Sequence, residues 1–204
     1  MHRFKFTFAG VAVAVALLVL LAACGDSATP ETVDTPGDGD EPTAPRPTSF
    51  DLPFGGARDR VDVIVDPARI VASTVQRVEA FDDGPFDRIE FTFDESVPDY
   101  TIEYVDAAFA CGSGLPVDVA GTAILEIRMQ PAAAHDEAGV ETMASAEMLF
   151  DFPTLLQLTM TCDFEGEVVW VAGLSEEVNF KNSFLTAPFA VHAIIIDLNH
   201  PGRD

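Results

Sequence analysis

The stretch Asp87-Arg88-Ile89-Glu90-Phe91-Thr92-Phe93-Asp94 decides the fold, because its apolar residues occupy every second position. This period of two places Ile89, Phe91 and Phe93 on one face of an extended chain and the polar residues on the other. An α-helix, with about 3.6 residues per turn, does not separate the residues in this way. The stretch therefore predicts a β-strand with one buried and one solvated face.

The same alternation recurs at residues 100–104, 123–129 and 156–162. Residues 168–172 and 193–196 are instead apolar at consecutive positions, which is typical of strands that are covered on both faces. Many short strands without long amphipathic helices predict an all-β domain, built as an antiparallel sandwich or barrel.

Two connecting segments carry their own signals. Residues 131–148 are rich in Ala and Glu and are interpreted as a loop with a short helix. Asp163-Phe164-Glu165-Gly166 is typical of a hairpin turn, because Gly166 can adopt a positive φ.

The N-terminus has the pattern of an export signal. His2, Arg3 and Lys5 precede residues 6–23, which contain no charge. Leu21-Ala22-Ala23-Cys24 resembles a bacterial lipobox, which implies a signal peptide at 1–23, cleavage before Cys24 and acylation of Cys24. The membrane is then a partner through this lipid anchor, and the domain faces the extracytoplasmic side. The alternative is an uncleaved anchor, since the apolar run could barely span a bilayer core of about 30 Å.

Residues 24–60 differ in composition from the rest of the chain. Pro, Thr, Gly and Asp dominate, and apolar residues are sparse. Such a segment cannot bury a core, so it predicts a disordered tether. The folded domain is expected at residues 61–204.

The charge of the chain excludes one large class of partners. Asp and Glu number 34 against 11 Lys and Arg, the formal net charge is −23 and the isoelectric point is near 4.1. Binding to nucleic acid phosphates through a basic face is therefore not expected. Gly-rich phosphate loops and paired-Cys zinc spacings are missing too, so no cofactor and no metal site are predicted.

Cys111 and Cys162 are the cysteines that remain once Cys24 is acylated. In an oxidising compartment, two cysteines in one exported domain most simply form a disulfide. In the chain-entropy model, closing a loop of about 50 residues stabilises a fold by up to about 4 kcal/mol. The alternative is a zinc site that adds His135 or His192, but no paired-ligand spacing supports it.

Few residues suggest a binding or catalytic role. Trp170 is interpreted either as a stacking platform for a sugar ring or as a core residue between valines. His135 is interpreted as a base or metal ligand, or as a solvated loop residue. Ser113 lies in Cys-Gly-Ser-Gly-Leu, which fails the nucleophile pattern of serine hydrolases. Paired carboxylates such as Asp82-Asp83 arise by chance in so acidic a chain, and no catalytic residue is predicted.

Several short motifs, in this order along the chain, resemble the AMIN-like domain of bacterial envelope lipoproteins. They are Phe86 to Phe91, Tyr100 to Asp106, Gly112-Ser113-Gly114, Pro116 to Gly121, Asp163 to Gly166, Gly173-Leu174, Pro188-Phe189 and Ile194 to Asp197. The resemblance spans about residues 70–200. It implies a β-sandwich related to AMIN domains, which accompany cell-wall amidases and secretins and target them to the envelope through peptidoglycan or partner proteins. It supplies no catalytic residue.

These observations lead to one functional hypothesis and one alternative. The hypothesis is a lipid-anchored, non-enzymatic module that engages an envelope protein or peptidoglycan. Residues 61–204 hold 26 acidic and six basic residues, which disfavours anionic wall polymers and slightly favours a protein partner over bare glycan. The acidity is equally well explained as adaptation to a salty habitat. The alternative function is a carboxylate-dependent cell-wall glycan hydrolase.

Overall fold

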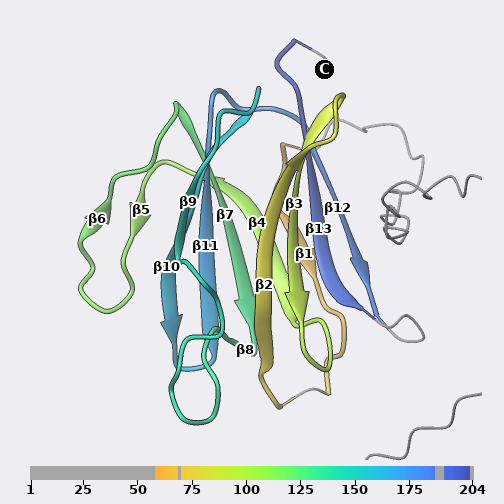
Figure 1. Cartoon of the computed structure of the whole chain (residues 1–204), viewed down its shortest axis with the longest axis vertical. Coiled ribbons are helices and arrows are strands. Elements are labelled where there is room, and N and C mark those ends of the chain that lie inside the picture. The colour runs from red at the N-terminus through yellow and green to blue at the C-terminus, as the bar shows by residue number, and fades with distance from the viewer. Residues whose placement is uncertain (1–57, 69, 187–190, 203–204) are drawn as a thin grey trace, which may run out of the picture. The chain divides into compact units, whose positions relative to one another are not determined.

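The computed structural model describes residues 58–68, 70–186 and 191–202. The expected signal peptide at 1–23, Cys24 and the tether as far as residue 57 lie outside the described residues. The described part contains thirteen strands and no helix (Figure 1), which confirms the all-β prediction. Accordingly, no described segment forms a helix that could cross a membrane.

The strands form two sheets that lie face to face and one small hairpin (Figure 1). In order across the first sheet, the six strands are β1 (Val61–Val63), β4 (Asp99–Val105), β7 (Ala123–Gln130), β11 (Glu167–Leu174), β10 (Leu155–Phe164) and β9 (Glu147–Leu149). The second sheet has the order β12 (Phe180–Leu185), β13 (His192–Asn199), β3 (Phe86–Phe93), β2 (Ser73–Asp82) and β8 (Ala132–Ala133). The hairpin pairs β5 (Ala108–Phe109) with β6 (Pro116–Val117). All pairings between these strands are antiparallel except that of β2 with β8.

The core lies between the two large sheets. Ile89 and Phe91 of β3 are fully buried, as are Leu125 and Ile127 of β7 from the facing sheet. Side chains at the alternate positions of β7, such as Glu126, are only half-buried. The period of two that predicted these strands is therefore the alternation between core and solvent, and the predicted antiparallel sandwich is confirmed.

Strand β11 is covered on both faces, as its consecutive apolar residues predicted. Every residue from Val168 to Leu174 is buried. The core covers one face. Residues 107–121, called the arm here, reach the other face at Val119 and Ala120, which lie against Gly173. The arm lies so close to β11 that a Cβ atom on Gly173 would be 2.2 Å from the carbonyl oxygen of Ala120. Only glycine fits at this position without moving the arm.

Of the two connecting segments with their own sequence signals, the β10–β11 turn agrees with its prediction and residues 131–148 do not. Strands β10 and β11 are joined through Glu165 and Gly166, both at positive φ, as the hairpin prediction requires. The prediction of a short helix within residues 131–148 is wrong, because this segment forms β8, turns and β9. Its backbone N–H groups are bound by side chains instead: Asp136 accepts from Ala138 and Val140. Such local bonds compete with helix formation.

Two tyrosines of β4 tie the sheets together. The Tyr100 hydroxyl accepts a hydrogen bond of 2.9 Å from the Asn182 amide of β12. The Tyr104 hydroxyl donates to the carbonyl of Val178 at 2.8 Å and accepts from its N–H at 3.0 Å. Burial raises the pKa of Tyr100, and the bond from Asn182 opposes this only in part.

The raised pKa of Tyr100 predicts a loss of stability at alkaline pH. The folded state favours the neutral phenol, so its contribution is complete below pH ~10, where unfolded tyrosine titrates, and disappears as pH rises through the higher folded pKa. Urea unfolding between neutral and strongly alkaline pH should show this decline, and Tyr100→Phe should reduce it. If tyrosinate absorbance shows Tyr100 titrating like an exposed tyrosine, the prediction fails.

Candidate functional site

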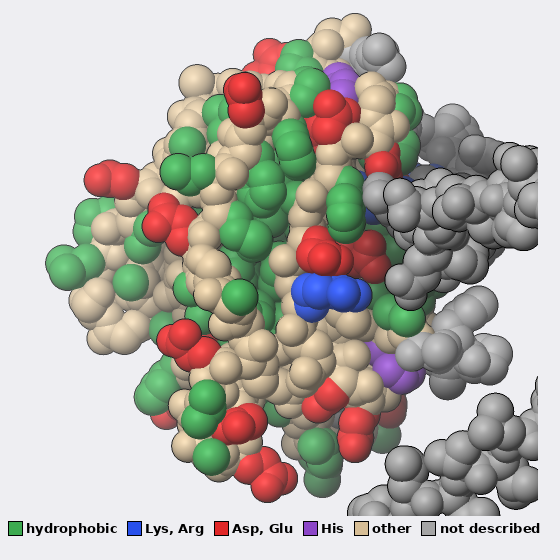
Figure 2. Space-filling view, in the orientation of Figure 1, with side chains coloured by type: hydrophobic (Ala, Val, Ile, Leu, Met, Phe, Trp, Pro, Cys, Tyr) green, Lys and Arg blue, Asp and Glu red, His purple; other side chains and the backbone are tan. Residues whose placement is uncertain are grey.

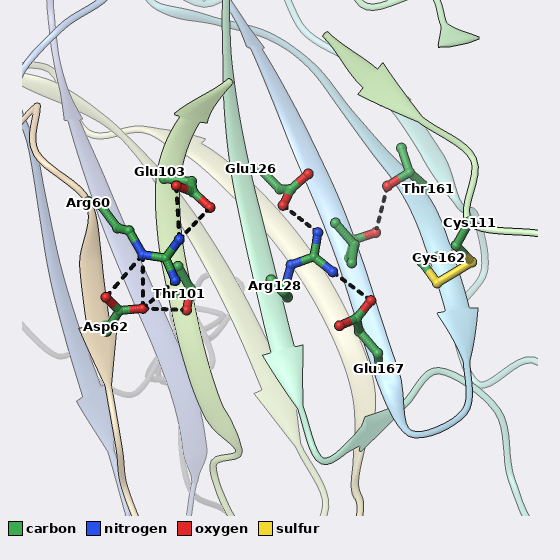
Figure 3. A network of polar contacts seen from close by, with 11 residues as sticks. Arg60, Asp62, Thr101, Glu103, Cys111, Glu126, Arg128, Thr161, Cys162 and Glu167 are labelled. Carbon is green, nitrogen blue, oxygen red and sulfur yellow. Dashed lines mark hydrogen bonds and ion pairs between the residues drawn. A yellow bond between two sulfur atoms is a disulfide. The ribbon is translucent and has the colours of Figure 1, made fainter. Parts of the chain in front are cut away.

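A row of side chains crosses the outer face of the six-stranded sheet (Figure 3). Strand register places Asp62 opposite Thr101, Thr101 opposite Arg128, Arg128 opposite Val169, and Val169 opposite Cys162. These five residues come from β1, β4, β7, β11 and β10 and share one face because cross-strand partners point to the same side of a sheet. With strands about 4.8 Å apart, the row is about 19 Å long.

Arg60 organises one end of the row. Its guanidinium donates to the carboxylate of Asp62 at 2.8–3.1 Å and to that of Glu103 at 3.0–3.2 Å. The Thr101 hydroxyl donates to Asp62 at 2.9 Å. Hydrogen bonds from Arg60 and then from Thr101 hold the pKa of Asp62 below its usual value. These bonds are solvent-exposed, so they orient the side chains more than they stabilise the fold.

Arg128 lies at the centre of the row. Its Nη1 donates to Glu167 at 2.6 Å and its Nη2 to Glu126 at 2.7 Å. Burial disfavours the charge of Arg128, but the bonds to Glu167 and Glu126 outweigh it and raise its pKa. Beyond it, the Thr161 hydroxyl lies 3.5 Å from the carbonyl of Val169. The guanidinium is thus a fixed cation held between two carboxylates.

The two arginines separate carboxylates that would otherwise repel each other. Glu103 of β4 lies directly opposite Glu126 of β7. Like charges in this position destabilise a sheet, but Arg60 binds the first and Arg128 the second. The row therefore has no free cation and offers fixed donors and acceptors to a ligand.

Two hollows flank Arg128, and it lines both of them. The larger, of about 410 Å³, is lined by Asp62, Val63, Ile64, Asp99, Tyr100, Thr101, Arg128 and Gln130. The smaller, of about 190 Å³, is lined by Phe109, Cys111, Glu126, Arg128, Thr161, Cys162, Glu167 and Val169. The Phe109 ring, 57% exposed, borders the polar groups of the smaller hollow. An exposed ring beside paired polar side chains is suited to stack on a sugar.

A disulfide fixes the arm next to the smaller hollow. Cys111 of the arm is bonded to Cys162 of β10 (Figure 3), and the Cys111 N–H donates to the Thr161 carbonyl at 3.1 Å. The expected pairing of Cys111 and Cys162 is thus present in the structure, and neither is part of a zinc site. The disulfide therefore fixes the position of Phe109 relative to the row of polar side chains.

Trp170 does not contribute to this surface. Its side chain is fully buried, and its ring packs edge-on against Phe91 with centroids 6.0 Å apart. No face of the ring is open to a sugar, so the stacking interpretation of Trp170 is wrong and the core interpretation holds. Sequence reasoning did not identify Phe109, whose role depends on the path of the arm across the sheet.

The three histidines within the described residues occupy different settings. His135 is half-buried, and its Nδ1 lies 2.7 Å from a carboxylate oxygen of Asp163. It borders an acidic groove of about 480 Å³ in which Asp94 and Glu137 also take part. His192 is half-buried at the start of β13. His200 is buried directly after β13.

The family model described as the AMIN-like domain matches residues 73–200. Because the match covers more than half of the chain, the protein belongs to the AMIN-like domain family. Domains of this family are envelope modules and are generally non-catalytic. Comparisons with curated proteins and with solved structures give no match.

The disulfide predicts a measurable share of the stability. Replacing Cys111 and Cys162 together by alanine should lower the free energy of unfolding by up to about 4 kcal/mol, because the unfolded chain regains the entropy of a loop of 51 residues. Urea unfolding followed by Trp170 fluorescence measures the change. Dithiothreitol should lower the urea midpoint of the wild type and leave that of the variant unchanged. An unchanged midpoint for the wild type would show that the crosslink does not constrain the unfolded chain.

Proposed function

We propose that this protein is a lipid-anchored, non-enzymatic envelope module that holds peptidoglycan glycan on the outer face of its six-stranded sheet. The observation that carries the proposal is the row from Asp62 to Cys162, with Arg128 at its centre and Phe109 beside it. Acylation of Cys24 would keep the module at its membrane. The tether could then span on the order of 100 Å when fully extended.

The length and chemistry of the row favour a linear polar polymer. The exposed side chains of the row, from Asp62 to Arg128, span about 10 Å, and Phe109 lies beyond them, because Val169 and Cys162 are buried. Guanidinium and carboxylate groups present donors and acceptors in fixed directions, which suits sugar hydroxyl and amide groups. Phe109 adds an apolar face for a ring. The contacts would therefore be stacking and hydrogen bonding.

The charge of the domain limits which part of the wall can be held. Residues 61–204 hold 26 acidic and six basic residues, and on the face seen in Figure 2 acidic side chains are scattered while basic ones are few. Arg60 and Arg128 are each engaged by two carboxylates. The surface consequently does not attract anionic wall polymers, and neutral sugar is the part of the wall it would contact. A basic envelope protein is the other partner that this charge would tolerate.

The enzymatic alternative finds less support at this site. A glycosidase needs one carboxylic acid that donates a proton and a second carboxylate that acts as base or nucleophile. Glu126 and Glu167 are the carboxylates nearest the smaller hollow, and both are salt-bridged to the same guanidinium. That arrangement positions Arg128 and leaves neither glutamate as an isolated acid.

Co-sedimentation with purified cell-wall sacculi tests the proposal. The wild type should be retained, and Phe109→Ala should weaken retention about tenfold, since stacking of about 1–1.5 kcal/mol corresponds to that factor. Arg128→Gln should weaken it at least as much, because it also releases Glu126 and Glu167. The same samples are analysed for soluble fragments.

The matched control is Arg77→Gln. Arg77 also forms an exposed Arg–Glu pair, with Glu79 at 3.2 Å, but on β2 of the other sheet. The Arg77→Gln variant should be retained by sacculi as strongly as the wild type. Equal retention of all four proteins contradicts the assignment of the face. Absence of retention and of fragments points to an envelope protein as the partner, whereas release of fragments points to an enzyme.

A further inference from the structure

We infer that Asp82, Asp87 and His200 form a binding site for a zinc-type divalent cation, separate from the outer face of the six-stranded sheet. One ligand atom from each residue lies within 4.8 Å of the other two. The residues come from the end of β2, the start of β3 and the residue after β13. In Figure 1 the C-terminal end of the chain lies beside the β2–β3 hairpin, where these elements meet.

The register of β2 and β3 creates a need for positive charge here. Asp82 and Asp87 are direct cross-strand partners, a position in which like charges destabilise a sheet. Asp87 is fully buried, where an ionised carboxylate must be compensated. The Nε2 atom of His200 lies 2.9 Å from a carboxylate oxygen of Asp87 and 3.9 Å from one of Asp82. A divalent cation bound by all three groups would neutralise the pair.

The distances suit such an ion. Zinc bonds of about 2.0–2.1 Å in tetrahedral geometry place ligand atoms about 3.3 Å apart. The separations of 2.9 and 3.9 Å lie on either side of this value. Asp82 has a side chain that is 46% exposed, so it can close the small gap. One imidazole and two carboxylates are ligands zinc accepts, with water at the fourth position.

The surroundings hold the ligands in place. The second oxygen of Asp87 accepts N–H bonds from Thr154 at 2.8 Å and Leu155 at 2.7 Å. The Oδ1 atom of Asp82 accepts from Gly84 at 2.9 Å. Hydrogen bonds of this kind orient the ligands of known metal sites. The exposed side of Asp82 gives the ion a path from solvent.

Zinc would replace the direct bond between His200 and Asp87. The ion takes the lone pair of Nε2, so the proton of the neutral imidazole resides on Nδ1 in the bound form. Binding then links the C-terminal end of β13 to the β2–β3 hairpin. The metal should consequently stabilise the folded domain by an amount that grows with the logarithm of its concentration above the dissociation constant.

Titration of the full-length protein with Zn²⁺ alone tests the site, by calorimetry and thermal unfolding. The wild type should bind and its unfolding temperature should rise. Asp82→Asn keeps the His200–Asp87 bond and removes one ligand, so it should fold normally and bind zinc at least about tenfold more weakly. Glu79→Gln removes the same charge from a half-buried position of the same strand and should bind zinc as the wild type does.

X-ray absorption of the zinc-loaded protein supplies a second readout. The spectrum should show oxygen and nitrogen ligands that include one imidazole, and no sulfur. If the wild type and Asp82→Asn bind zinc with equal affinity, the inference is overturned. A sulfur ligand in the spectrum also overturns it. A wild type that does not respond to zinc also overturns it, and would show that His200 balances Asp87 without a metal.

Discussion

The register of β7 between β4 and β11 is the constraint on which the rest of the structure depends. It sends Leu125, Ile127 and Met129 into the core and Glu126 and Arg128 to the outer face. A slip of one residue would exchange these two sets. The row across the sheet, the separation of Glu103 from Glu126 and the packing against β3 all follow from this single alignment.

Much of the fold could be predicted from the sequence because its signals are local. Alternation identified β3, β4, β7 and β10, and consecutive apolar residues identified β11 and β13. The segment 131–148 was misjudged because Ala and Glu favour helix in isolation. In the folded chain, side chains such as Asp136 bind its backbone instead, and tertiary contacts hold the segment against β2.

The site residues were harder to predict, because they come together only through pairing of distant segments. Asp87 and His200 are 113 residues apart, and no short motif joins them. Arg60 and Glu103 are 43 residues apart. Phe109 is an ordinary apolar residue until the arm is placed over β10. Trp170 is the single tryptophan of the sequence, and its valine neighbours indicated the burial that the structure shows.

The strands at the sheet margins have a bearing on how such a domain behaves when many copies are crowded together. Both outermost strands of the larger sheet, β1 and β9, are three residues long, and the two residues of β8 cover part of β2. Short margins offer few unpaired backbone groups to a neighbouring copy. Together with the acidic surface, this makes fibre-like joining of copies through the margins of the larger sheet unfavourable.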